Sequence, residues 1–178
     1  TEAGLPRPAT DLRRLILDTA LDIIEAEGMK ALTQPKIARR ANLRQSHLTY
    51  YFPRKADLYI ALLEASHDRA SRHAQPSSVE DMLAGLMFDR ERMRFFLSII
   101  LEVGDDPELQ AVLRAHASGL ADHVAPYYGR CPGDAAVIAF VDELRGIGIR
   151  LLLSPADVGF TGDLVTTTAE ARGLLPRK

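Results

Sequence analysis

Between Gly28 and Ala56 the sequence contains seven cationic side chains and no Asp or Glu. The cations are Lys30, Lys36, Arg39, Arg40, Arg44, Arg54 and Lys55. The whole chain of 178 residues has a formal net charge of -2, so this excess of positive charge is local. With no acid inside the stretch, nothing close in sequence neutralises these cations. Such a surface is typical of a protein that binds a polyanion.

Side chains that can read base edges lie inside the same stretch. They are Gln45, Ser46, His47, Thr49 and Tyr50. Glutamine can pair bidentately with adenine, and threonine can form a hydrogen bond or contact the methyl group of thymine. The surrounding cations would hold phosphates, which position a protein on a duplex without reading its sequence. We therefore expect recognition of double-stranded DNA.

Local signals arrange these side chains on two short helices. Thr33 suits the N-cap position of a helix over 34–41. Asn42 follows it, and asparagine accepts the left-handed backbone of a tight turn at low cost. A second short helix is expected over 45–51, with Leu48 facing the core. Two short helices joined by such a turn have the geometry of a helix-turn-helix.

Longer helices flank this motif. Apolar residues recur at helical spacing from Leu12 to Ile24, which predicts a helix over 11–27 that ends at Gly28. Another helix is expected from Pro53 to about residue 73, on which we expect Arg69 to be simply solvated. Residues 1–9 contain two prolines and a glycine and are expected to form a flexible arm.

Beyond a joint at Gln75–Ser78 the pattern is helical to the end. We expect further helices over 78–88, 90–103, 107–128, 135–153 and 162–174, with Ser78 and Asp106 as N-caps. No segment has the alternating pattern of a strand, and no internal repeat is visible. The expected fold class is all-α, with an N-terminal three-helix helix-turn-helix domain, a larger C-terminal helical bundle and about nine helices.

Composition and charge support two parts with different tasks. Residues 1–75 hold 12 Lys and Arg against 9 Asp and Glu, whereas residues 76–178 hold 10 against 15. Hydrophobic residues make up 47% of the chain, which is enough to fill a core. The single Cys131 excludes an intrachain disulfide, and the apolar runs are too short to span a bilayer. We expect a cytoplasmic protein.

The run Ile16–Leu63 resembles the DNA-binding domain of the tetracycline-repressor (TetR) family of transcriptional regulators. The matching features are Ile16-Leu17-Asp18-Thr19-Ala20, Glu27-Gly28, Thr33, Ile37-Ala38, Ala41-Asn42-Leu43, Leu48, Tyr50-Tyr51-Phe52, Lys55 and Leu58. The resemblance implies a DNA-binding domain over 1–52. It also implies a ligand-binding and dimerisation domain over 53–178, with the helix from Pro53 as connector.

Function and partners follow from the same resemblance. It implies a repressor that a small apolar ligand releases from a palindromic operator, and a homodimer formed through the last two helices. Gly146 and Gly148 would allow those helices to approach closely. DNA geometry also favours a dimer, because one short recognition helix reads too few base pairs by itself.

The resemblance assigns roles to residues of the DNA-binding set. Phosphate contacts are implied for Thr33, Tyr50 and Lys55, and base contacts for Gln45, Ser46, His47 and Thr49. Lys36 and Arg44 complete the set through their charge. The chain departs from the family pattern in three places: Asn42 replaces the usual turn glycine, Arg44 the usual Ser or Thr N-cap, and Thr49 an aromatic residue.

Candidate ligand-binding residues lie on the C-terminal helices. They are Met82, Leu86, Phe95, Phe96, Ile99, Glu102, His116, Leu120, Phe140 and Glu143. Composition does not separate pocket from core here, because both are lined by apolar residues. No catalytic triad, paired-carboxylate motif, metal-ligand spacing or glycine-rich phosphate loop stands out. We therefore expect no enzyme, no cofactor and no metal site.

Two other kinds of protein remain open at this point. One is a dimeric DNA-binding protein without an effector, whose second domain only dimerises. The other is a helical adaptor whose basic surface binds a protein or an acidic membrane.

Overall fold

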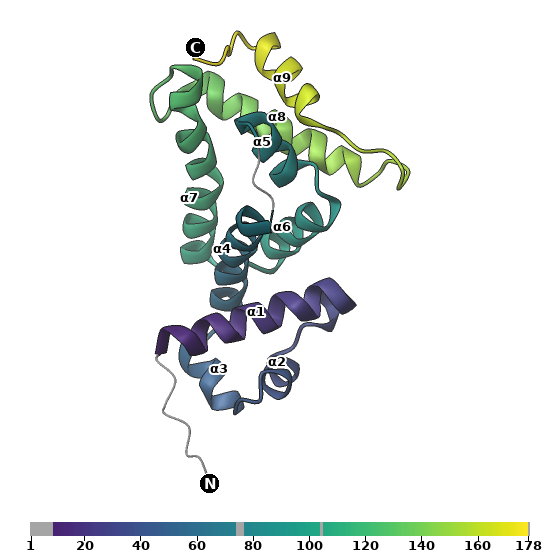
Figure 1. The fold of residues 1–178 in the computed structure, drawn as a ribbon. Helices are drawn as coiled ribbons and strands as arrows, with labels where there is room; N and C mark the ends of the chain where they lie inside the picture. The colour runs from purple at the N-terminus through teal and green to yellow at the C-terminus, as the bar shows by residue number, and fades with distance from the viewer. Residues whose placement is uncertain (1–8, 74–76, 104, 178) are drawn as a thin grey trace. The chain divides into compact units, whose positions relative to one another are not determined.

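The computed structural model describes residues 9–73, 77–103 and 105–177. Residues 1–8 of the predicted arm and residues 75 and 76 of the predicted joint lie outside these ranges. Within them the chain is all-helical, which confirms the fold class (Figure 1). The α-helices are α1 (Ala9–Glu27), α2 (Gln34–Arg40), α3 (Gln45–Tyr51), α4 (Lys55–His73), α5 (Val79–Met87), α6 (Arg90–Val103), α7 (Pro107–Val124), α8 (Ala135–Leu151) and α9 (Gly162–Ala171). Two short 3-10 helices, η1 (Met29–Ala31) and η2 (Ala125–Tyr128), complete the described elements.

The chain divides into two compact units, Thr1–Ala70 and Ser71–Lys178. The predicted boundary lies earlier, between residues 52 and 53. Most of α4 belongs to the first unit in the structure, where Arg69 joins it to α1. Each unit is described by itself below.

The helix-turn-helix of the first unit is built by local signals. The Thr33 hydroxyl oxygen accepts a hydrogen bond from the backbone N–H of Lys36 at 3.3 Å and so caps α2. Asn42 has a φ of 54°, the left-handed conformation predicted for the turn. Figure 1 shows α2 and α3 side by side beneath α1, and both predictions for this turn are confirmed.

Buried apolar side chains hold this unit together. The amphipathic α1 buries Ile16, Ala20 and Ile23 completely, as its spacing predicts. Leu48 of α3 is 1% exposed, so the opposite side of that helix is held outward.

Arg69 is not solvated as expected from sequence; it joins α4 to α1. Its guanidinium donates hydrogen bonds to Asp22 Oδ1 at 2.9 Å and Glu25 Oε1 at 3.1 Å. A third hydrogen bond runs to the backbone oxygen of Asp18 at 3.2 Å. Hydrogen bonds to charged partners are the stronger kind, so this contact stabilises the α1–α4 pair. The sequence could not reveal it, because the partners lie 44 to 51 residues away.

Helix α8 is central to the second unit. It contacts α5, α6, α7 and α9, and Figure 1 shows it between α7 and α9. Phe140 and Leu144 of α8 are completely buried in a core that also includes Val165 of α9. The predicted caps are confirmed, because Ser78 accepts from the N–H of Asp81 at 3.0 Å and Asp106 accepts from the N–H of Glu108 at 3.0 Å.

Gly148 lets α8 and α5 approach each other. A Cβ atom at this position would lie 2.1 Å from the Met87 carbonyl oxygen, far inside van der Waals contact. Gly146, two residues earlier, has open space where a Cβ would be. Only one of the two glycines is therefore used for packing inside this unit.

None of the helices within the described ranges combines the length and apolar character that crossing a membrane requires.

Candidate nucleic-acid interface

Helix α3 presents a row of polar side chains to solvent. Gln45, Ser46, His47 and Thr49 are all exposed, and Tyr50 is 79% exposed. Leu48 points the other way into the core, which fixes the rotation of this seven-residue helix about its axis. The side chains expected to contact bases therefore share one accessible surface.

The two residues of α3 and its N-cap that depart from the family pattern, Arg44 and Thr49, differ in their hydrogen bonding. Arg44 takes the N-cap position with extended backbone and forms no side-chain cap hydrogen bond. Its charged group is thus left to interact elsewhere. The Thr49 hydroxyl donates to the Gln45 carbonyl oxygen at 3.2 Å, so its proton is used within the helix. Its methyl group and an oxygen lone pair remain for contact with a base.

In the folded protein, an acid from outside the cationic stretch contacts two of its cations. Glu27, one residue before the stretch, accepts hydrogen bonds from Lys36 Nζ and from Arg40 Nη1, the latter at 3.1 Å. The hydrogen bond from Lys36 and the charge of Arg40 hold the pKa of the Glu27 carboxyl below its ordinary value. The sequence-based view that nothing nearby neutralises these cations is therefore wrong for Lys36 and Arg40.

An acid after the stretch has a similar effect on Arg54. Asp57 Oδ1 accepts from Arg54 Nη2 at 2.9 Å, and Asp57 Oδ2 accepts from the backbone N–H of Arg54 at 3.0 Å. The second bond is a side chain in the first turn of α4 reaching back to the residue before the helix. The hydrogen bonds from the Arg54 guanidinium and backbone lower the pKa of Asp57. Arg54 is therefore part of the cap of α4.

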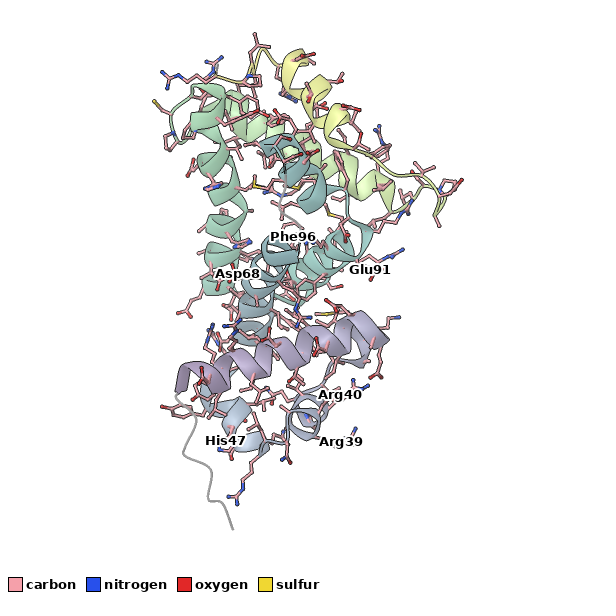
Figure 2. The ribbon with its side chains drawn as sticks, viewed as in Figure 1. Arg39, Arg40, His47, Asp68, Glu91 and Phe96 are labelled. Carbon is pink, nitrogen blue, oxygen red and sulfur yellow. The ribbon has the colours of Figure 1, made fainter. Side chains whose placement is uncertain are left out.

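The remaining cations differ in their surroundings. Lys30, Arg39 and Arg44 are exposed and have no hydrogen-bond or ion-pair partner among the described residues. The Lys55 ammonium lies over the ring of Tyr59, 5.3 Å from its centroid. Figure 2 shows Arg39 on α2 and His47 on α3 on the side of the first unit opposite α1. Arg44 directly precedes the polar row of α3, and Arg39 lies on α2, which packs against α3.

One cation near the end of α3, Arg13, was not singled out from the sequence. The Arg13 guanidinium of α1 lies 5.5 Å from the ring centroid of Phe52, directly after α3. The helical spacing of α1 could have placed Arg13 on the face opposite the core. Its proximity to the end of α3 depends on how the two helices pack.

The candidate ligand-binding residues fall into several groups. Phe95, Ile99 and Phe140 are buried, and Phe140 belongs to the central core of the second unit. Glu143 is exposed and accepts a hydrogen bond at 2.6 Å from Arg172, directly after α9, so it faces away from that core. The side chain of Glu102 lies outside the described part of the chain. The half-buried members are Met82, Leu86, Phe96, His116 and Leu120.

Arg145 is a charged residue of the second unit that the sequence did not single out. Its guanidinium lies 5.8 Å from the ring centroid of Phe96. It also donates to the Ala117 carbonyl oxygen at 2.6 Å and to Asp142 Oδ1 at 2.8 Å. Burial lowers the pKa of Arg145. A charge therefore lies beside one of the half-buried ligand candidates.

Apolar side chains remain exposed on and after α8. Ile138 and Ile149 are exposed on the helix, and Leu153, just after it, is 87% exposed. Gly146 lies between them in sequence and is open. This surface is unlike the face of α8 that carries Gly148, which packs against α5.

Comparison with known proteins agrees with this geometry. Residues 16–62 match the family model for bacterial regulatory proteins of the tetR family. No curated protein matches the sequence significantly.

Solved structures share the fold over almost the whole chain. The multidrug binding protein EbrR in complex with imidazole has 22% identity and a TM-score of 0.66, over 99% of this chain and 96% of that one. A TetR-family member from Streptomyces coelicolor has 21% identity and a TM-score of 0.61, over 94% and 99%. GusR from Salmonella enterica has 18% identity and a TM-score of 0.59, over 96% and 98%. The family model therefore assigns residues 16–62, which hold the helix-turn-helix, to the tetR family of bacterial regulatory proteins, and the solved structures show that the chain shares their fold.

Proposed function

We propose that this regulator is a repressor that binds double-stranded DNA through α3. The observation that carries the proposal is the row of exposed hydrogen-bonding side chains on α3, held outward by the buried Leu48. A helix presented in this way fits the major groove, where each base pair offers a distinct pattern of donors and acceptors. In this proposal Gln45, Ser46, His47 and Thr49 contact bases.

Phosphate contacts come from the groups around α3. Thr33, Arg44, Tyr50 and Lys55 are exposed at the ends of α2, α3 and α4, where they can reach the DNA backbone. Arg39 adds an exposed cation on α2. Such contacts determine affinity and its salt dependence, whereas the bases determine specificity.

The active form in this proposal is a homodimer joined through α8 and α9. The exposed apolar side chains Ile138, Ile149 and Leu153 support it, because burying them in a second copy is favourable. The open position at Gly146 would let a partner helix approach closely. A twofold dimer would read a palindromic operator in the cytoplasm.

A small, mainly apolar effector would release the DNA. The half-buried candidates Met82, Leu86, Phe96, His116 and Leu120 would contact it. Arg145 beside Phe96 favours an effector that also carries a hydrogen-bond acceptor. The EbrR structures contain imidazole and ethidium, which supports small-molecule control in a protein of this fold. Residues 1–52 would bind DNA and residues 53–178 would dimerise and bind the effector, with α4 connecting the two.

Release would operate as a shift between two conformations of the dimer. An effector can move this equilibrium only by binding one conformation more tightly than the other. The protein would act by binding, with no catalytic step.

Selection from a random duplex pool tests the proposal. We expect enrichment of an inverted repeat whose half-sites lie about one helical turn, roughly 34 Å, apart. Retention of DNA without any sequence preference at every salt concentration would contradict it and favour the adaptor alternative. Release of the selected operator is then measured with ethidium and imidazole as first probes. A regulator without an effector would stay bound in the presence of every compound tried.

A further inference from the structure

Where α1 meets α2, two cations of the proposed DNA-binding surface form ion pairs with a carboxylate. Glu27, at the end of α1, accepts hydrogen bonds from both Lys36 and Arg40, which lie one turn apart on α2. The side chains are 38% exposed for Glu27, 24% for Lys36 and 50% for Arg40. Glu27 and Arg40 are therefore open to solvent and to a partner molecule, whereas Lys36 is half-buried.

The same two cations are suited to a phosphate group. A carboxylate and a phosphate both accept charge-assisted hydrogen bonds from lysine and arginine. In helix-turn-helix proteins the first helix of the motif crosses the DNA backbone, and α2 is that helix here. Figure 2 shows Arg40 on the part of α2 nearer to α1, and Arg39 on its outer side. Glu27 thus occupies groups that DNA would otherwise use.

We propose that Glu27 competes with DNA phosphate for Lys36 and Arg40, and thereby lowers the affinity of the protein for all DNA sequences. This inference rests on the proposed DNA-binding function. A phosphate can contact these cations only by displacing the Glu27 carboxylate, so in the wild type they contribute little to DNA binding. Glu27 itself stays beside the DNA as a negative charge, which opposes binding after the exchange as well.

The consequence of this competition is greater specificity. Binding to non-specific DNA comes almost entirely from phosphate contacts. Operator binding has an additional contribution from base contacts, here those of α3. A residue that weakens phosphate binding therefore lowers non-specific occupancy and leaves base contacts to decide where the protein binds. Because a genome offers many competing sites, this ratio is the relevant quantity.

Substitution of Glu27 distinguishes this role from a purely structural one. The full-length variant Glu27→Gln is compared with wild type and with Glu25→Gln. Glu25 lies on the same helix and loses the same charge, but its partner is Arg69 of α4. Binding is measured for the selected operator and for a scrambled duplex of equal length, between about 50 and 200 mM salt, where phosphate contacts change affinity most clearly.

We expect Glu27→Gln to bind both duplexes about tenfold more tightly at low salt, because up to two more cations become available for phosphates. The slope of log affinity against log salt should steepen by up to about 1.8, since each contact contributes about 0.9. The gain should be at least as large for the scrambled duplex as for the operator. Glu25→Gln should change either affinity by less than about twofold.

Several results would overturn the inference. Unchanged or weaker binding by Glu27→Gln would show that the ion pairs only join α1 to α2. An equal gain in Glu25→Gln would assign the effect to net charge. If wild type prefers its operator in either case, the proposed function stands and only this inference fails. If wild type has no sequence preference, the proposed function and this inference both fail.

Lys36→Met provides a second measurement that does not depend on the folding of Glu27→Gln. In the wild-type background we expect this variant to lose less than about threefold in affinity, because Lys36 is already occupied by Glu27. A larger loss would show that Lys36 contacts phosphate in the wild type despite Glu27, and would contradict the inference.

Discussion

Helix α1 carries two ionic clusters of opposite composition, one facing α2 and the other facing α4. At its C-terminal end, one carboxylate, Glu27, lies between the two cations Lys36 and Arg40. In its middle and last turns, several acids surround one guanidinium, that of Arg69. These acids are Asp18, Asp22 and Glu25.

The difference between the clusters indicates different tasks. The α2-facing cluster has an excess of positive charge, and in the proposed function DNA phosphate is an alternative partner for its two cations. The α4-facing cluster has an excess of negative charge, which repels a polyanion, so we expect its contacts to stabilise the α1–α4 pair. Under the proposed function, charge balance separates a cluster that DNA can contact from one that stabilises the fold.

The largest effect that we expect is the loss of stability in Arg69→Ala. The substitution removes hydrogen bonds to charged partners and leaves three carboxylates close together, so the free energy of unfolding should fall by about 2 kcal/mol. Urea unfolding of the full chain measures it. Arg14→Ala is the matched control, because Arg14 pairs with Asp18 at 3.7 Å within α1 alone. An equal loss in both variants would show that the α1–α4 contact is not special.

A smaller effect is expected on DNA affinity, where substitution of Arg39 and of its neighbour Arg40 on α2 should give different losses. Arg39→Ala should weaken binding to every duplex about fivefold and reduce the salt slope by about 0.9, because Arg39 has no competing partner among the described residues. Arg40→Ala should cost less than about twofold, since Glu27 already occupies its side chain. Fluorescence anisotropy with operator and scrambled duplexes measures the DNA affinity of both variants. Equal losses would remove the distinction between free and paired cations.

The smallest effect should appear in the acid stability of the first unit. The pKa of Glu27 is lowered from an ordinary 4.5 and that of Asp57 from an ordinary 3.8. A lowered pKa in the folded state means that the contact stabilises the fold fully above the ordinary value. Its contribution is lost as the pH falls through the folded value.

Glu27→Gln and Asp57→Asn should therefore be slightly less stable than wild type at neutral pH. The difference should close as the pH falls below 4.5 for the first variant and below 3.8 for the second. Urea unfolding at a series of pH values measures it. A difference that persists or grows in acid would contradict the assigned ion pairs.

Local sequence signals predicted much of the fold and of the proposed DNA-binding face. The caps at Thr33, Ser78 and Asp106 and the left-handed Asn42 involve atoms only a few residues apart, so their chemistry can be read directly. The exposed polar row of α3 follows from the apolar position of Leu48 on the same helix. Helical spacing is enough to separate the two faces.

The candidate ligand residues show where such reading ends. Phe96 and Phe140 are both phenylalanines on apolar helix faces, yet one is half-buried beside Arg145 and the other is completely buried. Residue type is the same in the two environments, so the sequence could not separate them. Glu143 and Arg172 likewise pair across two helices, 29 residues apart.

What the sequence by itself determined is therefore the helical class, the helix-turn-helix and the polar face of α3. Each depends on spacing within one or two helical turns. The tertiary structure alone decided which charges remain available, because Glu27 reaches Lys36 and Arg40 across 9 and 13 residues and Arg69 reaches α1 across more than 40. It also decided that Gly148 packs inward while Gly146 stays open. Electrostatic pairing and close packing depend on distances in space, and these are set only when the helices pack together.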